Sequence, residues 1–206
     1  MSEPVVVDVY FDYACPYVHR AAHWLRDVES QLGPKQIKVN WKCFPLEQIN
    51  AAEDAKFALW ELPVERRSRG RDSLHAAVAA RRQGEGAFGR FHAALLALKH
   101  DQERDHGDAA TILQAAEDAG LDMTQFAADL ADRSLLEEVR DDYLIGRERH
   151  NVFGTPTFVF ANGNAAYLQL QPVPSLEEAV PFWEEFVRAV RDRPFLREIK
   201  RPRRPQ

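Results

Sequence analysis

The sequence is poor in cysteine, in long apolar runs and in excess positive charge. It contains two cysteines, Cys15 and Cys43, too few for a disulfide framework and too far apart for a CxxC pair. No apolar run approaches the ~20 residues of a transmembrane helix, and residues 1–4 lack the features of a secretory signal. With 27 basic and 32 acidic side chains, the net charge is −5. We therefore expect a cytoplasmic protein that binds neither membranes nor nucleic acids.

The rest of the composition is typical of a folded globular chain. Hydrophobic residues make up 45% of the sequence and charged residues 29%, which argues against extensive disorder. The 206 residues suit one domain, or one domain that carries a sizeable insertion. A chain of this length buries roughly 70% of its unfolded surface, so its stability requires neither a metal nor a disulfide.

The N-terminal part predicts a strand, a helix and a second strand. Val5–Phe11 is a near-continuous β-branched and aromatic run, as in a buried strand of a parallel sheet. Pro16 opens a helical pattern over residues 16–31, since proline suits the first turn of a helix. Ile37–Trp41 alternates apolar and polar side chains, which predicts the second strand. Together these elements predict a βαβ unit with parallel strands.

The period of the apolar residues is helical from residue 52 to residue 150. Asp108 and Asp122 stand where helix N-caps are expected. Ser134 and Glu137 have the spacing of a capping box, in which a hydroxyl and a carboxylate satisfy the first free amides. This block therefore predicts a helical subdomain.

Strand signals return at Thr157–Phe160. Residues 162–164, Asn-Gly-Asn, are typical of a hairpin turn, and residues 165–168 supply the returning strand. Ser175 and Glu178 form a second capping box, which opens a C-terminal helix. The basic, proline-rich tail that follows is expected to be a solvated chain end.

The predicted order is β-α-β, a helical block and β-β-α. This order predicts an α/β protein with a thioredoxin-like fold. The core would be formed by residues 1–51 and 151–206, and residues 52–150 would be a helical insertion.

Cys15 stands between the predicted first strand and the predicted helix start. A thiolate there faces the unpaired amides and the positive dipole end of the helix, which favours the nucleophilic form of the sulfur. The alternative is a buried structural cysteine.

Pro156 precedes the strand at Thr157, where a proline indicates a special backbone arrangement such as a cis bond. An ordinary trans proline is the alternative there.

Two short motifs together resemble the DsbA-like thioredoxin-fold superfamily. Phe11–Tyr17, FDYACPY, is similar to its turn from strand to active site, and Gly154–Thr157, GTPT, to its cis-proline loop. The split core around a helical insertion also matches, so the resemblance covers nearly the whole chain. The resemblance implies that Cys15 is catalytic. It also implies that Thr155 and Pro156 pack beside the sulfur and present backbone groups to a bound thiol.

The first motif departs from the dithiol members of that superfamily. Where they carry the second cysteine of CxxC, this chain has Val18, which cannot resolve a mixed disulfide. Cys15-Pro16-Tyr17 also resembles the Ser-Pro-Tyr of kappa-class glutathione transferases and 2-hydroxychromene-2-carboxylate isomerases, which use glutathione at a single polar side chain. Cys43 continues the apolar face of the second strand, so we expect a structural role for it rather than a resolving one.

Other residues of the active-site turn have alternative roles. Asp12 is expected to orient the turn through backbone hydrogen bonds, with proton transfer near the sulfur as the alternative. Tyr17 either hydrogen-bonds a bound sulfur or packs at the helix start, and His19 either tunes the Cys15 thiolate or is exposed. Cys15, His19 and His23 share one helical face, but three ligands on one helix would spread along about 12 Å. No metal site is therefore expected.

The sequence favours thiol–disulfide exchange by a monothiol route. Cys15 would attack a disulfide, and an outside thiol, with glutathione as the expected co-substrate, would resolve the adduct. The alternatives are a glutathione-dependent transferase or isomerase and a non-catalytic thiol-peptide binding module. No tightly bound cofactor is expected. The partner would be glutathione or a small thiol or disulfide, and formation of a homodimer is an open alternative. Six arginines of the helical block form either a solvated face or a site for the carboxylates of a glutathione-like ligand: Arg66, Arg67, Arg69, Arg71, Arg81 and Arg82.

Overall fold

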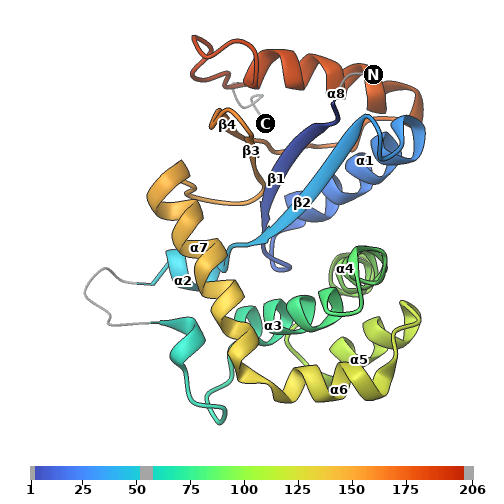
Figure 1. Ribbon diagram of the computed structural model, residues 1–206, viewed down its shortest axis with the longest axis vertical. Coiled ribbons are helices and arrows are strands. Elements are labelled where there is room, and N and C mark those ends of the chain that lie inside the picture. Colours follow the sequence, from blue (N-terminus) through green and yellow to red (C-terminus); the bar gives the residue numbers. More distant parts are fainter. Residues whose placement is uncertain (1–2, 52–57, 202–206) are drawn as a thin grey trace, which may run out of the picture.

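A four-stranded mixed sheet forms the centre of the molecule, which the computed structural model describes over residues 3–51 and 58–201 (Figure 1). Its strands are β1 (Val5–Phe11), β2 (Ile37–Cys43), β3 (Thr157–Phe160) and β4 (Ala165–Tyr167). The strand order is β2-β1-β3-β4, with β1 parallel to β2 and β3 antiparallel to both of its neighbours. The predicted mixed α/β fold and its parallel first pair of strands are confirmed.

Two helices, α1 (Pro16–Leu32) and α8 (Leu176–Val190), pack together on one face of the sheet (Figure 1). The indole of Trp24 is fully buried between them, and its Nε1 donates a hydrogen bond of 3.0 Å to the Ala179 carbonyl oxygen. Ser175 and Glu178 form the predicted capping box at the start of α8. The aromatic and branched side chains of these helices and of β1 therefore make one layer of the core.

Helix α7 (Leu136–His150) packs against the opposite face and connects the helical block to β3 (Figure 1). Gly146 of this helix lies against the ring of Tyr10 in β1. A Cβ atom at Gly146 would stand only 2.6 Å from Tyr10 Cε1, so the close approach requires glycine. Asn151 then ends α7 in a left-handed conformation with φ 52°.

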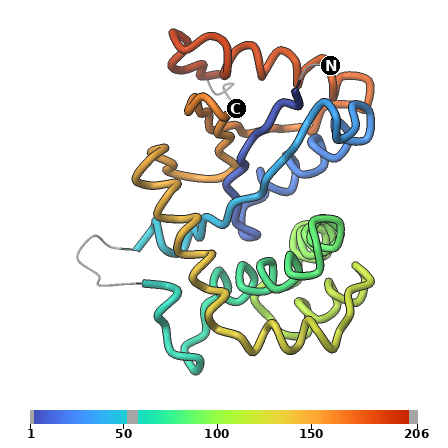
Figure 2. The backbone as a smooth tube through the Cα atoms, viewed as in Figure 1, coloured from blue at the N-terminus to red at the C-terminus, as the bar shows by residue number. Residues whose placement is uncertain are grey.

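The helical block leaves the core after β2 and returns through α7, as the chain trace shows (Figure 2). Its longer helices are α3 (Arg69–Arg81), α4 (Glu85–His100), α5 (Ala109–Asp118) and α6 (Met123–Ala131), and its short turns are α2 (Leu46–Ile49), η1 (Leu59–Glu61) and η2 (Arg133–Leu135). The predicted start of this block at residues 52–57 lies outside the described residues. Among the residues that are described, no helix is both long and apolar enough to cross a membrane.

The N-caps of the block are only partly as predicted. Asp108 and Asp122 accept hydrogen bonds from the first amides of α5 and α6, as predicted. The capping box at Ser134 is wrong, because Ser134 lies inside η2. Asp132, two residues earlier, accepts the hydrogen bond from the Ser134 amide and takes the capping role.

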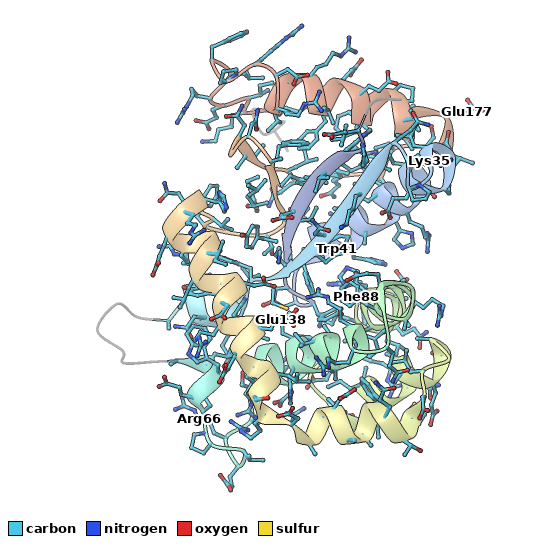
Figure 3. All side chains as sticks on the ribbon, viewed as in Figure 1. Lys35, Trp41, Arg66, Phe88, Glu138 and Glu177 are labelled. Atoms are coloured by element: carbon cyan, nitrogen blue, oxygen red, sulfur yellow. The ribbon has the colours of Figure 1, made fainter. Side chains whose placement is uncertain are left out.

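One continuous apolar cluster joins the core to the helical block. The ring of Phe11 in β1 lies 6.4 Å from the ring of Phe88 in α4 and 5.8 Å from that of Trp41 in β2. Trp41 and Phe88 face the junction between the two parts of the molecule (Figure 3). Arg81 of α3 also crosses this junction, donating a hydrogen bond of 2.7 Å to the Trp41 carbonyl oxygen.

Candidate active site

Cys15 is the N-cap residue of α1, directly before Pro16 at the first helical position. Its backbone is extended (φ −86°, ψ 115°), and its side chain is 6% exposed. The Sγ atom donates a hydrogen bond of 3.2 Å to the carbonyl oxygen of Thr155, a residue 140 positions later in the chain. The sulfur therefore lies at a helix N-terminus, where unpaired amides favour negative charge.

The loop before β3 forms the other side of the sulfur. The Thr155–Pro156 peptide bond is cis, and Thr155 is 3% exposed. The Pro156 carbonyl oxygen accepts a hydrogen bond of 3.2 Å from the Leu168 amide, so the end of β4 holds this loop. In the described part of the chain the Thr155 hydroxyl has no hydrogen-bond partner, whereas its carbonyl faces Cys15.

Asp12 fixes the turn that carries Cys15. Its carboxylate is 1% exposed and accepts hydrogen bonds of 2.7 Å from the amides of Ala14 and Leu46, one on each oxygen. Its carbonyl oxygen accepts a further bond of 3.1 Å from the Cys15 amide. Burial raises the pKa of this carboxyl, while the two amides act in the opposite direction. These contacts match the expected turn-orienting role.

Aromatic side chains lie near the active-site turn and the cis-proline loop. Tyr17 is half-buried, with the guanidinium of Arg20 5.3 Å from its ring centre. Tyr167 of β4 pairs with Thr157 of β3, and its ring lies 3.4 Å from the place of a Cβ atom at Gly154, so it lies against the cis-proline loop. Burial raises the pKa of Tyr167. Phe153, 65% exposed, packs on Tyr167 with ring centres 5.2 Å apart. The sequence analysis missed both residues, because Tyr167 reaches the cis-proline loop only through the pairing of β3 with β4, and Phe153 packs on Tyr167.

His19 belongs to a separate polar cluster next to this site. Its Nε2 atom lies 3.0 Å from His23 Nε2 and 3.5 Å from Asp101 Oδ2, and its ring stacks on His100. Burial lowers the pKa of His19 to about 4, so the imidazole is neutral at pH 7. It therefore supplies no positive charge to Cys15 at that pH. The sequence analysis did not predict that His100 and Asp101 lie beside this helix.

Cys43 lies at the end of β2, level with the end of β1, since the strand register pairs Phe11 with Cys43. It is fully buried, and burial raises the pKa of its thiol well above the ordinary value. Its backbone amide donates a hydrogen bond of 3.0 Å to Asp142 Oδ2. The predicted burial of Cys43 is confirmed, and both cysteines are free thiols.

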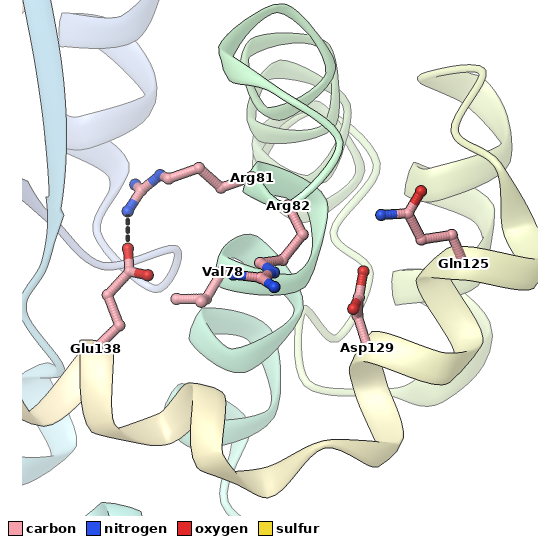
Figure 4. A pocket seen from close by; sticks show the side chains of 6 residues that line it. All are labelled: Val78, Arg81, Arg82, Gln125, Asp129 and Glu138. Atoms are coloured by element: carbon pink, nitrogen blue, oxygen red, sulfur yellow. Dashed lines mark hydrogen bonds and ion pairs between the residues drawn. The ribbon is translucent and has the colours of Figure 1, made fainter.

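The arginines of the helical block do not gather at the sulfur. Arg71 is buried and donates to the carbonyl oxygens of Leu62 and Pro63, and Arg81 contacts Glu138. A pocket of about 370 Å³ lies between α3, α6 and α7 and contains none of the residues around Cys15 (Figure 4). It is lined by Val78, Arg81, Arg82, Gln125, Asp129 and Glu138.

Comparison with known families agrees with this geometry. The family described as "DSBA-like thioredoxin domain" matches residues 6–180, from β1 into α8. The chain belongs to this family. The DSBA-like assignment spans both the sheet and the helical block, so the block is part of the family fold.

Two relatives of this DSBA-like protein match it over very different shares of their own lengths. Uncharacterized protein Rv2286c of Mycobacterium tuberculosis is 29% identical over 97% of this chain and 83% of its own length. The Na⁺/H⁺ antiporter NhaA 1 of Salinispora arenicola is 31% identical over 78% of this chain, but this chain spans only 20% of that protein.

Solved structures show the same fold at low identity. The thiol-disulfide exchange protein α-DsbA2 of Wolbachia pipientis has a TM-score of 0.59 and 15% identity, covering 90% of this chain and 83% of its own. A 2-hydroxychromene-2-carboxylate isomerase has a TM-score of 0.63 and 15% identity, covering 89% of this chain and 95% of its own. The fold is therefore shared by an exchange protein and an isomerase.

Proposed function

We propose that this DSBA-like protein catalyses thiol–disulfide exchange through Cys15 alone, with glutathione resolving the adduct. The observation that carries the proposal is the contrast between the chain's two thiols. Cys15 lies at the N-terminus of α1 against the Thr155 carbonyl, whereas Cys43 is fully buried. Val18 occupies the position at which a CxxC motif would place its second sulfur. A resolving thiol must therefore come from outside the chain.

The proposed cycle has two exchange steps. The Cys15 thiolate attacks the glutathione sulfur of a mixed disulfide, and the other thiol leaves as a thiolate that takes up a proton. Cys15 and glutathione are then joined by a disulfide. A second glutathione thiolate attacks the glutathione sulfur of that adduct, which releases glutathione disulfide and restores the Cys15 thiolate. In sum, one mixed disulfide and one glutathione give the free substrate thiol and glutathione disulfide, so the substrate sulfur is reduced and one glutathione is oxidised.

The residues around Cys15 suit positioning roles in this cycle. The Sγ–Thr155 hydrogen bond requires a thiol proton, so ionisation of Cys15 frees the Thr155 carbonyl to accept a donor from the substrate. Asp12 holds the turn rigid through its two backbone partners. Tyr17 follows Pro16 in the active-site turn and Tyr167 lies against the cis-proline loop, so their rings would contact a bound substrate, with Arg20 next to Tyr17 as a cation for a carboxylate.

A glutathione-dependent isomerase or transferase is the second candidate. The likeness to 2-hydroxychromene-2-carboxylate isomerase over 95% of that chain supports it, together with the Cys15-Pro16-Tyr17 sequence. In this function glutathione would be activated beside residue 15 without forming a disulfide. A hydroxyl at this position could also donate to a glutathione thiolate.

One set of variants separates these functions. Reduction of a glutathione mixed disulfide is followed through glutathione reductase and NADPH, for the wild type, Cys15→Ser and Cys43→Ala. We expect Cys15→Ser to fall to the uncatalysed rate and Cys43→Ala to keep the wild-type rate. Electrophile conjugation or isomerisation that survives in Cys15→Ser would support the second candidate. Glutathione binding without any turnover would indicate a thiol-peptide binding module.

The cycle also sets a requirement for the cellular compartment. It consumes reduced glutathione, so we propose that the protein works in the cytoplasm, where thiols are kept reduced. Mass analysis of the protein isolated under acid trapping tests this, because a reducing compartment predicts that Cys15 is recovered as a thiol or a glutathione adduct.

A further inference from the structure

The His19 cluster combines three metal-binding side chains from two helices. His19 and His23 come from successive turns of α1, and Asp101 is the C-cap residue of α4. One ligand atom from each lies within 4.8 Å of the other two. The His19 side chain is 13% exposed and that of Asp101 is 58% exposed. The cluster is therefore held by packing on its inner side and open to solvent on its outer side.

The distances fit one small ion. Nitrogen and oxygen ligands stand about 2.0–2.2 Å from Zn²⁺, so two ligands at a tetrahedral angle are about 3.4 Å apart. The two imidazole nitrogens are 3.0 Å apart, and His19 Nε2 is 3.5 Å from the Asp101 oxygen. The spacing of four residues places both imidazoles on the same side of the helix. The third pair, His23 and Asp101, lies within 4.8 Å, so a bound ion requires these two side chains to draw closer together.

We infer that His19, His23 and Asp101 form a binding site for a divalent transition metal ion, with Zn²⁺ as the ion that the donor set fits. Two imidazoles and one carboxylate are ligands that zinc accepts, and the fourth position remains open to water. The objection to a metal on α1 concerned Cys15, His19 and His23, all from one helix. Asp101 replaces the cysteine and closes the site from α4, so the ligands no longer spread along one axis.

The neighbouring groups both support and oppose the ion. His100 stacks on His19, and its Nε2 bonds to the Tyr13 carbonyl oxygen at 2.9 Å, which fixes the orientation of the stack. Arg26, an exposed side chain, contacts His23 Nδ1 at 2.9 Å. Arginine can only donate there, so metal binding at Nε2 requires this contact to break.

A bound ion would connect the two parts of the molecule. Helix α1 belongs to the thioredoxin-like core and α4 to the helical block, so the metal would join them directly beside the active-site turn. Binding to the folded state alone stabilises it by mass action. At a zinc concentration one hundred times Kd, the melting temperature is expected to rise by roughly 5–10 °C.

The test is a zinc titration of the full chain without a polyhistidine tag, in competition with a chromophoric chelator. We expect one Zn²⁺ per chain, with and without alkylation of Cys15. His23→Gln and Asp101→Asn should each weaken binding by more than about tenfold. The matched controls His150→Gln and Asp118→Asn, which lie outside the cluster, should bind as the wild type does. Arg26→Ala should tighten binding, because it removes a competing donor and a positive charge.

Several results would overturn the site. One is a wild-type chain that binds no zinc; another is binding that His23→Gln and Asp101→Asn leave unchanged. Loss of binding on alkylation of Cys15, or a sulfur-to-cobalt charge-transfer band with Co²⁺, would assign the ion to the cysteine instead. The titration does not depend on exchange activity, so it stands or fails separately from the proposed function.

Discussion

The ends of β1 and β2 lie side by side, and each has a cysteine: Cys15 shortly after β1, and Cys43 as the last residue of β2. The two thiols have opposite surroundings. After β1 the chain turns through Asp12 and places Cys15 at a helix N-terminus, with its sulfur against the Thr155 carbonyl. The last residue of β2 is Cys43, which is fully buried, with its amide bonded to Asp142. The comparison teaches that a few residues of turn, rather than position along the sheet, decide whether a thiol meets unpaired amides or apolar core.

The largest expected difference between the two thiols is in their alkylation rates. Cys15 should react in the native protein, whereas Cys43 should react only when the fold opens, because it is fully buried and its pKa is raised. For an ordinary folding stability, this predicts a ratio of at least roughly 10³. Iodoacetamide labelling followed by peptide mass analysis measures both rates. Comparable rates in the absence of denaturant would contradict the contrast.

Asp12 is the next test, because it ties the two strand ends together. Asp12→Ala removes the acceptor of two amides, at Ala14 and Leu46, and should lower the free energy of unfolding by about 2–3 kcal/mol. It should also slow exchange, since the turn that carries Cys15 loses its anchor. Asp12→Asn keeps one carboxamide oxygen and should lose about half as much. Urea unfolding monitored by fluorescence gives these values, with Asp118→Ala as the exposed control.

The pH dependence of stability should come from a buried imidazole near the end of β2. Burial lowers the pKa of His92 to about 3, and this ring packs on Phe11 and Trp41 next to the end of β2. The unfolded chain takes up a proton near pH 6.5, whereas the folded chain does not until about pH 3. The contribution of neutral His92 to the free energy of unfolding is therefore fully present above pH 6.5 and is lost as the pH falls towards 3.

The contribution of His92 can be isolated by substitution. His92→Phe should reduce the slope of unfolding free energy against pH by up to about 1.4 kcal/mol per pH unit between pH 6 and 4. His19 and His106, whose pKa values burial lowers to about 4, should maintain part of the slope. Parallel slopes for the wild type and His92→Phe would show that this imidazole titrates equally in both states.

The smallest effect is expected from Cys43→Ala. Removing one buried sulfur leaves a small cavity, which should cost about 1 kcal/mol of unfolding free energy. Exchange activity should stay at the wild-type rate, and mild oxidation with glutathione disulfide should give one adduct on Cys15 in both proteins. A Cys15–Cys43 disulfide found in the wild type by intact-mass and peptide analysis would make Cys43 a resolving thiol.

Local patterns in the sequence predict much of the fold. The helix that starts at Pro16 and the capping box at Ser175 depend on contacts between near neighbours, and the parallel pair of strands follows from the strand-helix-strand order. The structure has all three. The capping box at Ser134 fails because Asp132 stands two residues earlier and competes for the same amides. Spacing alone does not show which of two nearby caps begins the helix.

The residues of the candidate site are also predictable only in part from local patterns. The sequence predicts Cys15 and Asp12 from the strand-to-helix turn, and the resemblance of two motifs adds Thr155 and Pro156. Tyr167 comes within electrostatic range of Cys15 only through the pairing of β3 with β4, and Asp101 reaches His19 only through the packing of α4 on α1. These contacts join residues more than 80 positions apart in the chain, for which no local pattern provides a signal.

The position of Arg81 bears on how the molecule unfolds. Its guanidinium lies 4.5 Å from the ring centre of Phe88, contacts Glu138 and donates to the Trp41 carbonyl, so one side chain links α3, α4, α7 and β2. Since lysine lacks the planar fork that makes these contacts together, Arg81→Lys would not be a conservative change. We therefore expect the helical block and the sheet to unfold as one cooperative unit, so heat or urea should melt them in a single transition rather than one after the other.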